Sequence, residues 1–351
     1  MLQLFFHAWE RRLAAATKTR VVRPFDWGLD WLPPDAPQDG SPIERLQRWV
    51  HAVLQDTPAF FAAPATDDYE YQTAGPDAHG QGEAGTLRFP SALVTPHPVN
   101  NTVTARWFPA AREKQDARRL GRAVVVLPQW NAGPDGHIGL SRLMARSGIS
   151  ALRLSLPYHD VRMPAELSRA DYIVSADVTR TLQVCRQAVL DARRAIGWLA
   201  SQGFDRIGIV GSSLGSCLSL LTSAHEPLIR AQALNHVSPF FADVVWRGLS
   251  TLHVRRGLDG HITLEQLREM WMPISPMAHL ERVRNTQTLL LYARYDLTFP
   301  VDLSKRLVAE FKRLDLPHEV ARLPCGHYTT GSAPFKYLDA YLLIRFLRRT
   351  L

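Results

Sequence analysis

Short, mostly apolar runs alternate with helix-length segments along this chain, and this order limits its fold more than any other feature. Residues 123–127 (AVVVL) and 149–154 (ISALRL) have the character of strands buried on both faces. Helices are predicted at 137–146 and 178–202. Later strands are predicted at 206–210, 231–234, 287–292 and 318–323, and later helices at 214–224, 301–313 and 334–349. We therefore predict an α/β protein with a mostly parallel, doubly wound sheet and flanking helices.

The first part of the chain does not follow this alternation. Residues 1–84 are predicted to form a helical and irregular N-terminal extension. Within it, helices are expected at 1–20 and 42–55, the second with one apolar stripe. Residues 62–83 are rich in Ala, Pro, Gly and acidic residues, so a loop is expected there.

Residues 85–351 are predicted to form the main domain, which opens with strand-like runs at 85–93 and 102–108. The stretch 237–285 interrupts the alternation. It holds two helix-like pieces, 239–256 and 263–271. Because it lies between two strands, we expect it to cover a pocket as a helical cap; an ordinary crossover with elaboration is the alternative.

The sequence GSSLG at 211–215 follows a predicted strand and opens a predicted helix. In that context G-x-S-x-G marks a sharp turn that exposes the central serine, here Ser213. Ser212 is its neighbour and falls outside the central position. A glycine- and serine-rich turn at a nucleotide site is the alternative, but the chain contains no GxGxxG and no GK[ST] motif. Ser213 is the predicted nucleophile.

A serine nucleophile needs a base and an acid, which follow it in the chain order Ser, Asp or Glu, His. Asp296 comes just after the next-to-last predicted strand, and His327 after the last one. Because parallel strands end at one edge of a sheet, both can meet Ser213 there. Asp302 is the second choice for the acid. His236 is the rival base, but it precedes the acid, and a polar contact beneath the cap is its alternative.

Two backbone N–H groups are expected to hold a developing oxyanion. Leu214 opens the helix behind the nucleophile and supplies one of them. The loop after strand 123–127 normally supplies the other, and we assign it to Trp130, with Gln129 as the near alternative. A packing role is the other interpretation of Trp130. Gln129 and Asn131 are expected to line the substrate pocket.

The segment LPYHD at 156–160 should reach the same sheet edge. Tyr158 and His159 are predicted to line the substrate pocket, with a structural role left open. Arg162, Arg169 and Arg180 follow closely in the sequence. They could steer an anionic head group or lie in solvent.

Composition excludes several classes of function. The net charge of +8 favours anionic partners, but no basic helix interleaved with aromatics and no zinc-finger spacing occurs, so no nucleic-acid partner is predicted. The thirteen histidines show no HExxH pattern, and neither a metal nor a cofactor is predicted.

Three cysteines, without a CxxC pair, argue against a disulfide framework and for a reducing compartment. No run of about 20 apolar residues suggests a membrane span. The N-terminus lacks the order of a secretory signal, so a cytoplasmic location is expected. An amphipathic helix at 1–20 leaves peripheral membrane contact open. The oligomeric state is not determined by the sequence.

GSSLG, YARYD and CGHYTTG, in this order, resemble the α/β-hydrolase superfamily over residues 85–351. PQWNA, LRLSLPYHDVRMP and NHVSPFFADVVWRGLST are similar to a bacterial hydrolase group related to the abhydrolase-domain-containing 18 proteins. The resemblance implies an esterase- or lipase-like enzyme that cleaves a small-molecule or lipid ester through an acyl-enzyme. An acyltransferase with the same residues and a catalytically silent binding protein are the alternatives. The chain lacks the HGGG motif of many lipases, which leaves the second oxyanion donor open.

Overall fold

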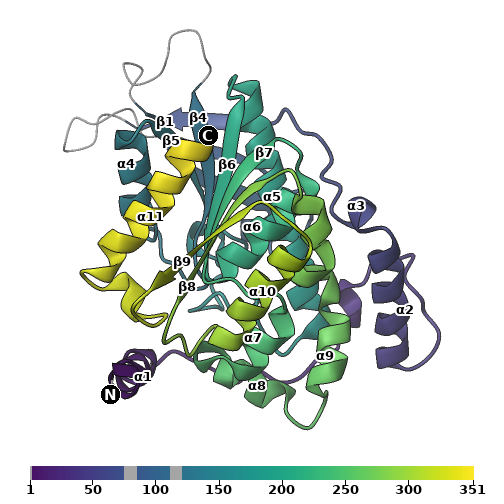
Figure 1. The fold of residues 1–351 in the computed structure, drawn as a ribbon. Coiled ribbons are helices and arrows are strands. Elements are labelled where there is room, and N and C mark those ends of the chain that lie inside the picture. The colour runs from purple at the N-terminus through teal and green to yellow at the C-terminus, as the bar shows by residue number, and fades with distance from the viewer. Residues whose placement is uncertain (1, 75–84, 111–120) are drawn as a thin grey trace.

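The structure is a computed structural model that describes residues 2–74, 85–110 and 121–351. Within these ranges the strands join in one sheet, in the order β1-β2-β3-β5-β4-β6-β7-β8-β9 (Figure 1). Their bounds are Glu70–Thr73, Gly85–Pro90, Thr102–Phe108, Arg122–Leu127, Ile149–Leu154, Arg206–Ser212, Ile229–Asn235, Gln287–Ala293 and His318–Leu323, for β1 to β9. Neighbours pair in parallel from β5 to β9, whereas β1, β2 and β3 form an antiparallel edge. The predicted fold class, a mostly parallel doubly wound sheet, is confirmed.

Helices cover both faces of the sheet. Their bounds are Leu2–Ala15, Pro42–Gln55, Thr57–Phe60, Ile138–Arg146, Val178–Ser201, Leu214–His225, Phe241–Arg247, Leu252–Leu258, Leu264–Met270, Val301–Arg313 and Phe335–Thr350, for α1 to α11. Side chains alternate along β4, so that Val124 belongs to the core cluster that includes Met144 of α4 and Phe346 of α11. Val125 belongs to the cluster on the opposite face, which includes Leu182 of α5. In the described ranges, no helix combines the length and apolar character needed to cross a bilayer.

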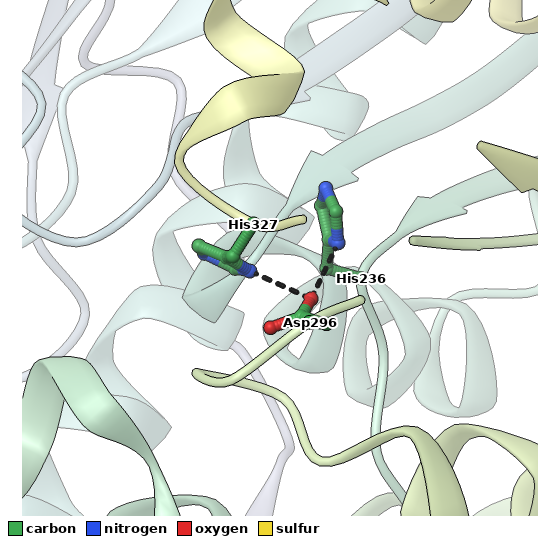
Figure 2. Close-up of side chains that lie close together, drawn as sticks. All are labelled: His236, Asp296 and His327. Carbon is green, nitrogen blue, oxygen red and sulfur yellow. Dashed lines mark hydrogen bonds and ion pairs between the residues drawn. The ribbon is translucent and has the colours of Figure 1, made fainter. Parts of the chain in front are cut away.

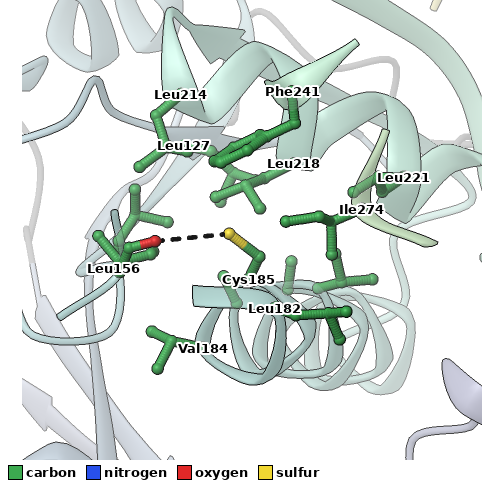
Figure 3. Packing of buried hydrophobic residues seen from close by; sticks show 14 of the residues in the cluster. Leu127, Leu156, Leu182, Val184, Cys185, Leu214, Leu218, Leu221, Phe241 and Ile274 are labelled. Atoms are coloured by element: carbon green, nitrogen blue, oxygen red, sulfur yellow. Dashed lines mark hydrogen bonds between the residues drawn. The ribbon is translucent and has the colours of Figure 1, made fainter. Parts of the chain in front are cut away.

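The core between the sheet and α5 and α6 extends to the segment after β7. Figure 3 shows Leu127 of β4, Cys185 of α5 and Leu218 of α6 close to Phe241 of α7 and Ile274. Residues 237–285 contribute α7, α8 and α9, which lie at the lower end of the sheet in Figure 1. This segment is therefore anchored in the core of the domain.

Some predicted elements have other limits in the structure. Helix α1 ends at Ala15, short of the predicted 1–20. Residues 70–73, inside the predicted loop 62–83, form strand β1 paired with β2; the part of this loop from 75 onward lies outside the described residues. The helix predicted at 239–256 is interrupted at Gly248, where a Cβ would lie 2.5 Å from the carbonyl oxygen of Thr298.

Candidate active site

Ser213 lies at the sharp turn between β6 and α6. Its backbone has φ 57° and ψ −119°, a strained conformation for a residue other than glycine, and its N–H donates to the carbonyl of Asn235 at 2.8 Å. The turn also needs two residues without side chains. A Cβ at Gly211 would lie 2.1 Å from the carbonyl oxygen of Gly215. The tight turn fixes Ser213 at the carboxyl edge of the sheet.

His327 comes from the loop between β9 and α11 and reaches back to this edge. Its Nε2 lies 3.1 Å from Oγ of Ser213, and its Nδ1 lies 3.0 Å from Oδ2 of Asp296. The ring of Phe299 stacks on the imidazole, with centroids 5.3 Å apart and planes 2° apart. The structure therefore brings together the three residues that the sequence assigned to nucleophile, base and acid.

Asp296 follows β8, is buried, and uses both carboxylate oxygens. Oδ1 accepts from the backbone N–H groups of Thr298 at 2.8 Å and Phe299 at 2.7 Å. Oδ2 faces His327. Asp302, the second choice for the acid, is bound instead by Arg247 away from this site, at 2.8 and 2.9 Å.

The electrostatics of the pair follow from burial and mutual attraction. Burial would raise the pKa of Asp296, but the charge of His327 and the hydrogen bonds that the carboxylate accepts outweigh it and hold that pKa well below its ordinary value. Burial would lower the pKa of His327, but the charge and hydrogen bond of Asp296 raise it above 6.5. The pair thus favours an ionised acid beside a basic imidazole.

A second histidine shares the acid. Nδ1 of His236 lies 2.9 Å from Oδ2 of Asp296, and its Nε2 lies 3.2 Å from Oγ1 of Thr330. Figure 2 shows how both histidines point toward Asp296. Burial and the nearby charge of His327 lower the pKa of His236. The sequence correctly placed His236 at the carboxyl edge of the sheet. It did not predict the contact with Asp296, because His236 precedes the acid in the chain and was therefore rejected as the base.

The fold of this chain is similar to that of several solved structures. No protein-family model matches the chain, and neither does any curated protein. Among solved structures, the acetyl xylan esterase from Paenibacillus sp. R4 matches with a TM-score of 0.62 and 15% identity, over 94% of this chain and 100% of that one. Acetyl xylan esterase 1 from Thermoanaerobacterium sp. JW/SL YS485 matches with a TM-score of 0.57 and 14% identity, over 86% and 94%. The chain has the α/β-hydrolase fold.

The Pyrococcus horikoshii acylaminoacyl peptidase matches over a smaller share of its length. Its TM-score is 0.60 and its identity 17%, over 77% of this chain. The chain spans 42% of the length of that peptidase. The similarity therefore covers part of a longer protein.

In this α/β-hydrolase fold, the spacing of His236, Asp296 and His327 would also suit a metal ion, since one ligand atom of each lies within 4.8 Å of the others. Two observations favour hydrogen bonding instead. Both Nδ1 atoms approach the same carboxylate oxygen at hydrogen-bond distance. Nε2 of His327 faces the hydroxyl of Ser213. The arrangement is suited to moving a proton from the serine.

Loop 128–131, which follows β4, lies against the start of α6. A Cβ at Gly215 would lie 2.2 Å from the carbonyl oxygen of Leu127 and 2.5 Å from that of Pro128. Leu214 is in the first turn of α6, where no helical carbonyl accepts its N–H. The close approach therefore brings loop 128–131 to the helix end behind the nucleophile.

The N–H groups of loop 128–131 have different partners. The N–H of Asn131 donates to Nε2 of His159 at 2.9 Å and is thus occupied. The indole of Trp130 donates to the carbonyl of Ala170 at 2.7 Å, which fixes the side chain. The backbone N–H of Trp130 stays our choice for the second oxyanion donor, with Gln129 as the alternative.

A cavity of about 840 Å³ opens at this edge, with Ser213 and His327 in its wall. Gln129 and Asn131 line it, as do apolar residues of two helix pairs. These are Leu214, Cys217, Phe241, Val244 and Val245 of α6 and α7, and Leu140, Leu143, Tyr337 and Ala340 of α4 and α11. Cavities that bind small molecules commonly measure roughly 300–1,000 Å³. This one has room for an organic substrate with a sizeable apolar part.

Tyr158 and His159, predicted to line the pocket, do not line this cavity. Both are buried in the domain. Tyr158 packs in the core and its hydroxyl lies 3.0 Å from Nδ1 of His97. His159 accepts the N–H of Asn131, so it supports loop 128–131 from behind. The polar side chains of Tyr158 and His159 thus form hydrogen bonds within the domain. The sequence alone could not distinguish such bonds from contacts with a substrate.

The three arginines that the sequence left open have different surroundings. Arg162 is fully buried, with Nη2 2.9 Å from Asp191, so its solvated interpretation is wrong. Nη1 of Arg180 lies 3.3 Å from Asp177. Of these three arginines, Arg169 is the one that lines the cavity.

Helix α1 takes part in the site through Glu10, which sequence reasoning missed. Its buried carboxylate accepts from the N–H groups of Tyr328 and Thr329, each at 2.9 Å, and from Oγ1 of Thr329. A Cβ at Gly326 would lie 2.4 Å from Cδ of Glu10. Gly326 thus allows a close approach between α1 and the loop that carries His327. A single acid in an apolar and basic helix gives little sequence signal for such a contact.

Proposed function

We propose that this chain is a serine hydrolase that cleaves carboxylic esters through an acyl-enzyme on Ser213. The observation that carries the proposal is the hydrogen-bonded series from Oγ of Ser213 to Nε2 of His327 at 3.1 Å, and from Nδ1 of His327 to Asp296 at 3.0 Å. Ser213 and His327 lie in the wall of a cavity that can hold a substrate. Nucleophile, base and orienting acid are the parts that acyl transfer requires.

In the first step, Nε2 of His327 takes the proton of Ser213 while Oγ attacks the ester carbonyl. Asp296 holds the imidazole by Nδ1 and stabilises the charged form that results. The N–H groups of Leu214 and Trp130 hold the oxyanion. Loss of one such donor typically raises the barrier by about 3 kcal/mol.

His327 then returns the proton to the leaving alcohol, and the acyl group stays on Ser213. A water molecule gives its proton to the same nitrogen and attacks the acyl-enzyme. Collapse of the second tetrahedral intermediate releases the acid and restores the serine. The raised pKa of His327 supports its role as the base in both halves.

The choice of an ester rests on the sequence resemblance to esterase-like hydrolases and on the names of two structural neighbours, which are acetyl xylan esterases. A third neighbour is named a peptidase. Rates with a p-nitrophenyl ester and the matching p-nitroanilide compare the two bonds directly. We expect turnover of the ester to dominate; faster cleavage of the anilide would contradict the proposed substrate class.

A fluorophosphonate probe tests the nucleophile. Labelling should be lost in Ser213→Ala and kept in Ser201→Ala, an exposed serine outside the cavity. Tandem mass spectrometry should place the adduct on Ser213 and not on Ser212. Equal labelling of wild type and Ser213→Ala would defeat the assignment, and a folded but unlabelled protein would favour a silent binding protein.

The apolar lining of the cavity bears on the acyl group. A series of p-nitrophenyl esters of increasing chain length measures how much of the lining the acyl chain uses. A preference for long chains would support a lipid substrate, and one for short chains a small ester. Product analysis with a competing alcohol separates hydrolysis from acyl transfer.

A further inference from the structure

Two arginine side chains, Arg20 and Arg169, line the same cavity as Ser213 and His327. Arg169 is only 8% exposed, and its guanidinium lies over the ring of Trp130, with 5.3 Å between Cζ and the ring centroid. Its Nε is buried and finds no hydrogen-bond acceptor in the described part of the chain. A nearly buried cation therefore stands beside loop 128–131 with hydrogen-bonding capacity unused.

The carboxylate paired with Arg169 is shared. Oδ1 of Asp171 lies 3.4 Å from Nε of Arg169, in a geometry that forms no hydrogen bond. Oδ2 of Asp171 instead accepts from Nε of Arg23 at 3.1 Å. One negative charge thus faces two guanidinium groups and cannot neutralise both.

Arg20 has a neutral partner. Its Nη2 donates to the phenol oxygen of Tyr328 at 2.8 Å, and its Nε is buried without an acceptor among the described residues. The carboxylates of Glu10 and Asp296, which bind the segment around Tyr328, already have partners. Glu10 accepts three hydrogen bonds from the 328–329 segment, and Asp296 is held by two histidines. Among the described residues, Asp339 is the one carboxylate that lines the cavity, and burial raises its pKa to about 7. Because Arg20, Arg169 and Lys336 line the same cavity, its wall carries excess positive charge.

His253 lies buried near the same two arginines. Its ring stacks on Trp130, with centroids 5.7 Å apart, and both of its nitrogens are buried without a partner in the described ranges. Burial, followed by the charges of Arg169 and Arg20, lowers the pKa of His253 to about 4. Uncompensated buried charge is costly, so such a cluster calls for an anion that the protein itself does not supply.

We propose that Arg20 and Arg169 form a subsite for an anionic group of the substrate, a carboxylate or a phosphate, next to the ester that Ser213 attacks. This inference rests on the proposed function and names its substrate class: an ester whose other end is negatively charged. A guanidinium group binds such anions through parallel N–H donors. The apolar lining would hold the chain that links the two groups.

The catalytic test uses two p-nitrophenyl esters with acyl chains of equal length. The hemiglutarate ends in a carboxylate and the valerate in a methyl group. In Arg169→Gln and in Arg20→Gln, kcat/KM for the hemiglutarate should fall by roughly tenfold or more, and for the valerate by less than about twofold. Equal losses with both esters would show that the arginines only support packing and would overturn the proposal.

Two variants serve as controls. Arg230→Gln removes the same charge from an exposed position outside the cavity and should leave both rates unchanged. Arg169→Lys keeps the positive charge but loses the parallel N–H donors of the guanidinium group, so it should retain part of the preference for the hemiglutarate. Because Arg20 is less buried than Arg169, Arg20→Gln keeps the test available if Arg169→Gln fails to fold.

A binding test separates this proposal from the ester function. Isothermal titration calorimetry on Ser213→Ala measures glutarate and inorganic phosphate without any turnover. At least one of them should bind, about tenfold more weakly after Arg169→Gln, and the preferred anion distinguishes a carboxylate from a phosphate ligand. If neither binds, the subsite is wrong even for an active esterase. If the wild-type protein binds the anion but is not labelled by the fluorophosphonate, the anion subsite is supported and the proposed esterase activity is refuted.

Discussion

His236 and His327 direct their Nδ1 atoms at one carboxylate oxygen, and their ring centroids lie 4.5 Å apart. Two charged imidazoles so close would repel each other, and burial keeps His236 in its neutral form. A neutral His236 donates its Nδ1–H to Asp296. It therefore draws part of the negative charge away from the bond that holds His327, and acts as a positioning residue for the acid.

Replacement of His236 by Phe removes this donor while it keeps a ring of similar size. Asp296 should then hold the charged form of His327 more strongly, so the acid limb of the kcat/KM profile should move to higher pH. A hydrogen bond of about 1 kcal/mol corresponds to roughly 0.7 pH unit. A lower rate with an unmoved acid limb would indicate that His236 only maintains the structure.

The wild-type protein should lose activity on acidification at a pH above 6.5. His327 must be neutral to accept the serine proton, and the charge of Asp296 raises its pKa above that value in spite of burial. As the pH falls through the raised pKa, His327 becomes protonated and stops acting as a base. Ester hydrolysis measured from about pH 5 to pH 9 covers this transition. An acid limb below pH 6 would contradict the assigned base.

Replacement of Glu10 by Ala should reduce both stability and kcat. It leaves the buried N–H groups of Tyr328 and Thr329 without an acceptor, which we expect to cost about 3 kcal/mol of unfolding free energy. The loop that carries His327 should then be less well fixed, so kcat should fall. Urea unfolding and ester hydrolysis measure the two effects, with the exposed Glu281→Ala as the matched control. An unchanged kcat would show that the loop holds its position without α1.

Replacement of His159 by Phe tests how loop 128–131 is held. Burial lowers the pKa of His159 to about 4, so its Nε2 is free to accept the N–H of Asn131 at neutral pH. Phe cannot accept it, and the loop should shift. We expect kcat to fall by roughly tenfold with KM little changed, because the oxyanion is bound more tightly in the transition state than the ground-state carbonyl. The exposed His51→Phe is the control. If the variant loses stability but keeps its kcat, His159 has no role in catalysis.

The elements predicted most accurately are those whose local sequence pattern favours the same structure as their packing in the domain. Helix 42–55 matches α2 residue for residue because Ser41 and Glu44 form a capping box and Pro42 opens the helix. The predicted strands 149–154 and 318–323 match β5 and β9, because each is a short run of residues between turn residues. The placing of Ser213, Asp296 and His327 needed only strand order and one sheet edge.

Other features depend on contacts between segments that are distant in sequence. Strand β1 is a short, exposed run whose pairing with β2 alone makes it a strand. The break at Gly248 follows from the close approach of Thr298, fifty residues later. His236 becomes visible as a partner of Asp296 only after β7 and β8 have been placed side by side. A local sequence pattern cannot predict these three features, because each depends on a residue far away in the chain.

The bonds from Glu10 to Thr329 join residues 319 positions apart. During synthesis, α1 leaves the ribosome before the loop that carries His327. His327 can reach Ser213 only after its loop has docked, so under the proposed function a nascent chain would be inactive. For the same reason, under the proposed function, proteolytic cleavage at the exposed Lys18 would lower the activity by freeing α1 from the loop that carries His327, although Lys18 itself has no part in catalysis.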